Sequence, residues 1–145
     1  MNKKNGISLV IVVTAVAIML ILISVASVVG TNAIKSANFD EYISVLNRVS
    51  DEVNMYYIEN EKLPVSSQTV VNYSTLPVEF KNTLNSKNDV NNKLFVVDVS
   101  LLKDKTIEKG KGSVEDQDVF LVAEDTHNVY YLKGFKYKSK MYYGV

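Results

Sequence analysis

The stretch that decides the fold is ISLVIVVTAVAIMLILISVASVVGTNAI, residues 7–34, which carries no charged side chain and begins directly after Lys3, Lys4 and Gly6. Its apolar part, residues 7–29, would form a helix roughly 34 Å long, against a hydrocarbon core of about 30 Å. The length therefore predicts a membrane span. Because basic residues favour the cytoplasmic side, we expect the N-terminus inside the cell and everything after about residue 35 outside.

The residues beyond this stretch predict a continuation of the same helix over residues 30–63. Apolar side chains recur there at steps of three and four, which is the pattern of an amphipathic helix: Phe39, Tyr42, Ile43, Leu46, Val49, Val53, Tyr56 and Tyr57. No proline occurs before Pro64, so both halves can form one helix that ends near Asn60 or Glu61. An apolar stripe of this kind needs a sheet to cover it.

The C-terminal part, residues 64–145, offers the strands for that sheet. Residues 94–99 (LFVVDV) form a candidate buried strand, residues 119–122 and 129–132 form a candidate hairpin, and residues 141–143 can add a third antiparallel strand after a lysine-rich connection. Residues 65–93 and 103–118 are polar and are expected to be loops, with at most one short helical turn. We therefore expect an α+β fold in which a long N-terminal helix packs on a small antiparallel sheet.

The leader Met1–Gly6, followed by Ile7-Ser8-Leu9-Val10 and a long apolar helix, resembles the type IV pilin and type II secretion pseudopilin family. The phrase YYIENEKLP at residues 56–64 and the two C-terminal runs DVFLV and NVYYLKG also look like that family. The resemblance implies a pilin-like fold, cleavage by a prepilin peptidase between Gly6 and Ile7 with N-methylation, and assembly through the helix that includes Ser8, Leu9, Val10, Ile11 and Thr14. Residues 1–6 would be the leader and residues 7–29 the transmembrane helix.

Ile11 departs from the family pattern, because major subunits usually carry glutamate at this place. That carboxylate is costly in lipid, and pairing with the N-terminal amine of a neighbouring subunit relieves the cost. The resemblance therefore implies a minor or divergent pseudopilin. Its partners would be other pilin or pseudopilin subunits, the peptidase, a membrane assembly platform, and membrane lipid before assembly. Protein secretion and DNA uptake both fit such a filament, which would end at the cell surface or outside the cell.

Two other classes stay open from the residues alone. The first is a single-pass membrane protein whose outer part is a binding or sensing module that never assembles. The second is a secreted domain released after Ala26, although the apolar core is longer than a secretory signal needs.

Few residues suggest chemistry. Glu115, Asp116, Asp118 and Asp125 are hard oxygen donors of the type calcium takes, and some pseudopilins hold calcium in this region, but a solvated acidic loop has the same sequence.

His127 is the one histidine and is expected in a hairpin turn. No catalytic triad order, paired-histidine spacing or phosphate-binding glycine loop occurs, so we expect no enzymatic activity. Formal charge is balanced, and the four lysines after residue 132 neutralise few phosphates, so DNA is a weak expectation.

Overall fold

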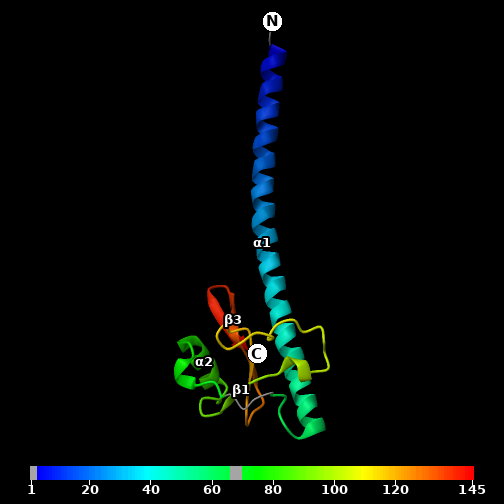
Figure 1. Cartoon of the computed structure of the whole chain (residues 1–145). Coiled ribbons are helices and arrows are strands. Elements are labelled where there is room, and N and C mark those ends of the chain that lie inside the picture. The colour runs from blue at the N-terminus through cyan, green and yellow to red at the C-terminus, as the bar shows by residue number, and fades with distance from the viewer. Residues whose placement is uncertain (1–2, 66–69) are drawn as a thin grey trace. The chain divides into compact units, whose positions relative to one another are not determined.

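The computed structural model describes residues 3–65 and 70–145, and it describes the side chains of the first helix only at residues 10–20 and from residue 34 onward. The chain divides into two compact units, Met1–Asn38 and Phe39–Val145. The first helix, α1, has the bounds Lys3–Asn60 and enters both units. The elements that follow are shown in Figure 1: η1 (Tyr73–Thr75), α2 (Val78–Ser86), β1 (Leu94–Val96), η2 (Val99–Leu101), β2 (Phe120–Ala123), β3 (Val129–Tyr137) and β4 (Lys140–Gly144).

The second unit confirms the expected α+β fold, because residues 39–60 of α1 pack on a four-stranded antiparallel sheet of order β1-β2-β3-β4. The predicted hairpin is confirmed by the pairing of Phe120 with Tyr131 and of Val122 with Val129. The predicted strand at residues 94–99 is shorter than expected. It ends at Val96, and the chain then turns into η2, whose N-terminus is capped by the Asp98 side chain.

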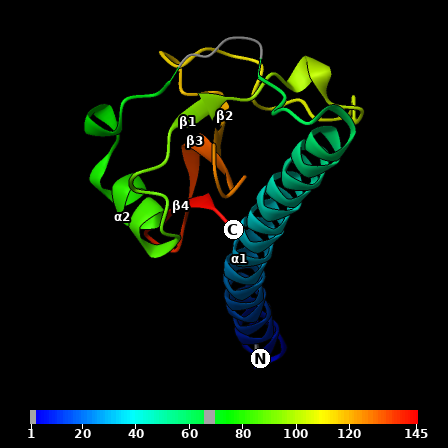
Figure 2. The same ribbon diagram turned by 90° about the horizontal axis from the view of Figure 1, so that it is seen from below.

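The sheet is covered on both faces, as the two views in Figures 1 and 2 show. The α1 stripe Tyr42, Leu46, Val49 and Val53 packs on one face. Phe80 and Leu84 of α2 pack on the other face. In β2, therefore, Phe120 and Val122 contact the α1 side while Leu121 and Ala123 contact the α2 side.

Three sequence expectations need correction. Residues 78–86 form the regular helix α2, although residues 65–93 were expected to be loop. The lysine-rich stretch after Gly134 is strand, because β3 continues to Tyr137 and turns at Lys138 and Ser139, both at left-handed φ. Tyr57, placed in the buried stripe, is 39% exposed and its ring lies 4.3 Å from the ring of His127.

Helix α1 ends at Asn60 as expected, and the local cause is the next residue. Glu61 adopts a left-handed φ of 55°, and its N–H donates to the Tyr57 carbonyl at 2.8 Å. This is the usual conformation of the first residue past a helix, although glycine is the residue that adopts it most easily. Pro64 follows three residues later and prevents the helix from resuming.

Candidate functional site

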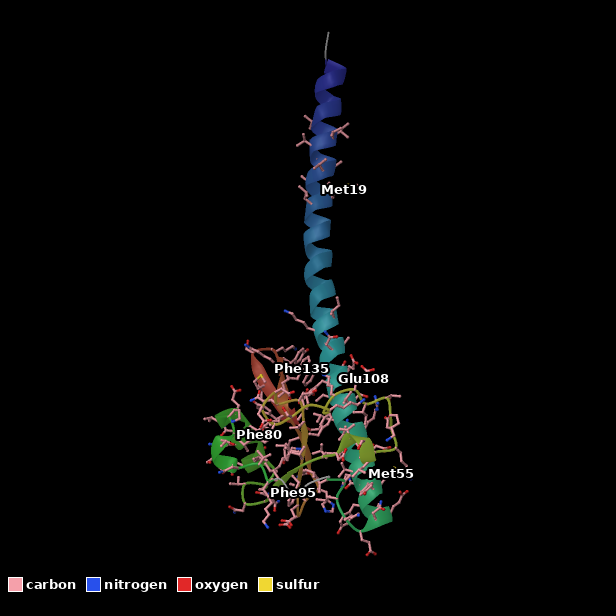
Figure 3. All side chains as sticks on the ribbon, in the orientation of Figure 1. Met19, Met55, Phe80, Phe95, Glu108 and Phe135 are labelled. Carbon is pink, nitrogen blue, oxygen red and sulfur yellow. The ribbon has the colours of Figure 1, made fainter. Side chains whose placement is uncertain are left out.

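Within the apolar segment 7–34 of α1, side chains are described at residues 10–20 and at Ile34, and all of them are exposed. Val10, Ile11, Val13, Met19 and Leu20 each expose more than 60% of their surface, and Figure 3 shows Met19 on this stretch. The Thr14 hydroxyl donates to the Val10 carbonyl, so its polar group is satisfied within its own helix, as expected for a hydroxyl in an apolar helix.

The rest of the predicted assembly segment is less fully described. Gly6, Ile7, Ser8 and Leu9, with residues 21–29 of the predicted span, lie outside the residues whose side chains the structure describes. Among the residues that were searched, no helical stretch is both long and apolar enough to cross a membrane.

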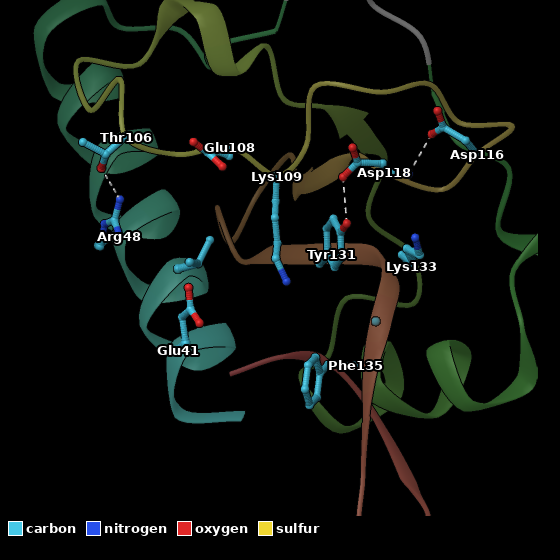
Figure 4. A pocket seen from close by; sticks show the side chains of 12 residues that line it. Glu41, Arg48, Thr106, Glu108, Lys109, Asp116, Asp118, Tyr131, Lys133 and Phe135 are labelled. Carbon is cyan, nitrogen blue, oxygen red and sulfur yellow. Dashed lines mark hydrogen bonds between the residues drawn. The ribbon is translucent and has the colours of Figure 1, made fainter. Parts of the chain in front are cut away.

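A cavity of about 770 Å³ lies in the second unit between α1, the loop before β2, and β3. Figure 4 shows its lining side chains, which are mostly charged or aromatic. The lining residues are Glu41, Val45, Arg48, Thr106, Glu108, Lys109, Asp116, Asp118, Tyr131, Lys133, Gly134 and Phe135. The lining holds four acidic and three basic side chains, so the cavity does not favour a ligand of one charge.

Asp118 of the cavity lining is held by two hydrogen bonds. Its Oδ1 accepts a hydrogen bond from the Gly110 N–H at 2.9 Å and one from the Tyr131 hydroxyl at 2.7 Å. These bonds, with the nearby Lys133 and Lys109, outweigh partial burial and lower the pKa of Asp118. Burial and the Asp118 carboxylate raise the pKa of Tyr131. Asp118 is therefore ionised and Tyr131 neutral at neutral pH, and their contact ties β3 to the loop.

Lys109 fills part of the cavity by placing its ammonium group among three aromatic rings. The Nζ atom lies 5.6 Å from the centre of the Tyr42 ring, 5.8 Å from Tyr131 and 6.0 Å from Phe135. Such distances allow cation–π attraction. The aromatic wall is thus already occupied by a cation of the chain itself, and Figure 4 shows Lys109 reaching into this space.

The loop before β2, which contributes Thr106 and Glu108 to the cavity lining, is fixed to α1 by side chains of that helix. Arg48 forms an ion pair with Asp104 at 2.9 Å and donates to the Thr106 hydroxyl at 2.6 Å. One helical turn further, Glu52 Oε2 accepts from the backbone N–H of Lys103 at 2.7 Å. The amphipathic helix therefore positions the loop as well as burying the sheet.

The residues expected as possible calcium ligands are not gathered into one group. In the part of the chain that was searched, no group of three or more acidic, histidine or cysteine side chains is placed to hold an ion. Asp116 Oδ1 instead accepts from the N–H groups of Ser113 and Asp118, both at 2.9 Å. Asp118 precedes β2 and Asp125 follows it, so they lie beyond opposite ends of a strand that is about 13 Å long. Glu115 is exposed.

His127 lies in the predicted turn, with a left-handed φ of 58°. Its backbone N–H donates to the Ala123 carbonyl at 3.0 Å. Its conformation confirms the turn interpretation.

A buried polar cluster beside this turn was missed by the sequence reading. Asp89 is fully buried, and its carboxylate accepts from Asn92 at 2.7 Å, Thr126 at 2.7 Å, Asn128 at 2.9 Å and the Tyr130 hydroxyl. It sits just past the end of α2, where its own N–H donates to the Leu84 carbonyl. In the sequence, Asp89 is an aspartate in a polar stretch, and such a residue cannot be told apart from an exposed loop aspartate. It joins α2 to the β2–β3 turn.

In the part of the chain that the structure describes, the polar side chains form structural hydrogen bonds and line a cavity, and none of the contacts above pairs a nucleophile with a base. Comparisons of the chain with known protein families, with characterised proteins and with solved structures find no match.

Proposed function

We propose that this protein is a structural subunit of a type IV pilus-like or type II secretion-like filament, assembled through its N-terminal apolar helix after removal of residues 1–6. The observation that carries the proposal is the exposed apolar surface of residues 10–20, on the same helix whose residues 39–60 pack on the sheet of an α+β unit. A helix that is apolar all round requires lipid or other helices as its surroundings.

The physical step would be an exchange of lipid contact for helix contact. Before assembly the helix of residues 7–29 is surrounded by lipid, with the second unit outside the cytoplasmic membrane. In the filament the same surface packs against equivalent helices, and interhelical packing replaces lipid contact. The fold of the second unit supports this role because residues 39–60 of α1 are anchored in its core, so the apolar helix is not a detachable tail.

Ile11 supports a role as a minor or divergent subunit. Its exposed aliphatic side chain has no charge with which to pair with the N-terminal amine of a neighbour. A prepilin peptidase and a membrane assembly platform are the further partners. An Ile11→Glu variant should change the incorporation of the subunit into filaments, and unchanged incorporation would count against this assignment.

One observation favours the second candidate, a membrane-anchored binding module that does not assemble. The cavity of about 770 Å³ has the size of a small-molecule site. The ammonium group of Lys109 already contacts the aromatic rings of the cavity, and Asp118 already accepts hydrogen bonds from the Gly110 N–H and the Tyr131 hydroxyl. The groups that would recognise a ligand are therefore already engaged within the chain. We therefore rank this function second.

Crosslinking tests the proposal directly, because the chain contains no cysteine. We expect Val12→Cys and Val16→Cys in native membranes to form disulfides between copies or with sister pilins carrying a matched cysteine. Lys93→Cys, exposed in the second unit, is the control for random collision. Crosslinking at residues 12 and 16 no stronger than at residue 93 would favour the binding module over the filament subunit.

A further inference from the structure

The turn between β3 and β4 carries a dense basic sequence. Residues 136–140 read KYKSK, and no acidic residue follows Asp125 in the chain. The three lysines, Lys136, Lys138 and Lys140, are exposed. We call residues 136–140 the basic tip. Lysines on an edge strand commonly prevent unwanted strand pairing, and Lys140 lies on the edge strand β4. Lys138 lies in the turn, outside the strand ladder, so edge protection does not account for it.

Aromatic contacts fix where the basic tip lies within the second unit. The Tyr42 ring is 6.1 Å from Tyr131 and 5.1 Å from Phe135, and one turn earlier in α1 the Phe39 ring is 6.0 Å from Phe135 and 4.4 Å from Tyr137. Moving toward the N-terminus of α1 thus corresponds to moving outward along β3. The basic tip therefore lies at the Phe39 end of the unit, where the chain connects to the apolar segment.

The length of that connection limits how far the basic tip can lie from a membrane surface. Residues 30–39 of α1, at about 1.5 Å per residue, span about 15 Å. The headgroup layer occupies about 5–7 Å of this distance beyond the hydrocarbon core. This leaves at most about 8–10 Å between Phe39 and the headgroups, which is close to one Debye length at physiological ionic strength, so the connection keeps the lysines within electrostatic reach of the headgroups.

The local charge balance and side-chain chemistry suit an anionic interface. Asp40 and Glu41 are the exposed acids next to Phe39, and the three lysines of the basic tip outnumber them. The ammonium groups of Lys138 and Lys140 lie 5.3 and 5.1 Å from the ring centres of Tyr137 and Tyr142. Tyrosine with lysine is the combination enriched where a protein meets headgroups.

We propose that in the membrane-inserted precursor the basic tip binds the headgroup phosphates of anionic phospholipids in the outer face of the membrane. The inference rests on the proposed function, since it requires residues 7–29 to be inserted. Docking would hold the second unit against the membrane until assembly lifts it away. Each lysine near an anionic surface is expected to favour the docked state about fivefold.

The test uses the full chain reconstituted in vesicles with a fluorophore on a single introduced cysteine. Ser139→Cys reports the basic tip, Ser100→Cys in η2 is a matched exposed serine, and Val16→Cys reports insertion. In vesicles containing phosphatidylglycerol, a headgroup nitroxide should quench the label at residue 139 and spare the label at residue 100. In phosphatidylcholine vesicles the quenching at residue 139 should fall to the level of residue 100.

Charge variants complete the design. In the phosphatidylglycerol vesicles, the combined change of the three tip lysines to glutamine should abolish quenching at residue 139. The same change at Lys62, Lys93 and Lys111, which are exposed elsewhere, should leave it intact.

The outcomes separate the two proposals. If an acyl-chain nitroxide fails to quench the label at residue 16, the helix is not inserted and the proposed function fails. If residue 16 is quenched but residue 139 behaves like residue 100, the membrane docking is wrong while the proposed function stands. Equal quenching at residue 139 in neutral vesicles, or release of the basic tip by a short DNA duplex at equal phosphate concentration, would overturn the assignment to anionic lipid.

Discussion

Replacing Asp89 by asparagine should destabilise the second unit substantially without creating a cavity. Asn92 and Thr126 donate to Oδ1 of the carboxylate, while Asn128 and Tyr130 donate to Oδ2. The amide of the variant keeps one acceptor oxygen and places an NH₂ group where the second oxygen was. Two hydrogen bonds to a charged acceptor are then lost, at about 1.5–3 kcal/mol each, and rotation of the Tyr130 hydroxyl to accept recovers part. We expect the free energy of unfolding to fall by about 2–4 kcal/mol.

The assay is urea unfolding of the full chain in detergent, followed by near-ultraviolet circular dichroism of the tyrosines. The matched control is Asp125→Asn, an exposed aspartate of the neighbouring turn, which should change stability by less than about 0.5 kcal/mol. An Asp89→Asn variant as stable as the control, with an unchanged dependence on urea, would refute the assignment of Asp89 as the link between α2 and the β2–β3 turn.

The pH dependence of this difference is a second, independent readout. Burial raises the pKa of Asp89, but its four hydrogen bonds outweigh burial and lower it overall. A lowered folded-state pKa means that the stabilisation is complete above the unfolded pKa, about 3.9, and is lost as the pH falls through the folded value. The difference in free energy of unfolding between the natural protein and Asp89→Asn should therefore have its full size at pH 7 and become smaller below about pH 4. A gap that is constant with pH would contradict an ionised Asp89.

Three further changes should lower the free energy of unfolding in the same assay. Tyr42→Phe removes a 2.6 Å hydrogen bond from the hydroxyl to a carbonyl of β4 and should cost about 1–2 kcal/mol, with Tyr73→Phe, exposed in η1, as the silent control. Gly110→Ala should cost at least about 2 kcal/mol, because φ is +82° and an added Cβ would lie 2.2 Å from the Phe120 ring; equal stability would show that the loop relaxes freely. Glu52→Ala leaves the N–H groups of Lys103 and Asp104 without their acceptor and should cost about 1 kcal/mol. A loss no greater than that of the exposed Asp51→Ala would contradict the role of Glu52 in fixing the loop to α1.

The parts of the fold that follow from local periodicity could be predicted from the sequence. The stripe Tyr42, Leu46, Val49 and Val53 has the helical repeat and is buried as expected. The hairpin was recognisable because β-branched and aromatic residues flank a polar turn. These signals are short in range, so one sequence is enough to see them.

What could not be predicted depends on contacts between distant segments. Helix α2 buries only Phe80 and Leu84, and its polar remainder reads as loop. Its existence explains why β2 is apolar at every position instead of at alternate ones, since both faces are covered. The strand character of Lys136 was hidden because its pairing with Met141 is made by backbone groups, which its side chain does not reveal.

The candidate site shows the same division. The exposed apolar surface around Ile11 is evident from composition, whereas the Asp89 cluster requires four donors from residues 92–130 to converge. The acids at residues 115–118 were visible as residue types, but their use as acceptors for backbone N–H groups depends on loop geometry. The sequence indicates which chemical groups are present, but which groups form hydrogen bonds with one another depends on the fold.

The most direct test of the central claim is the intact mass and N-terminal sequence of the protein recovered from its native membrane. Assembly as a pilin-like subunit predicts a chain that begins at Ile7 and carries an N-methyl group. A chain that still begins at Met1 or Asn2 would contradict the filament account and favour the anchored binding module, and a chain that begins at Ser27 would show a secreted domain.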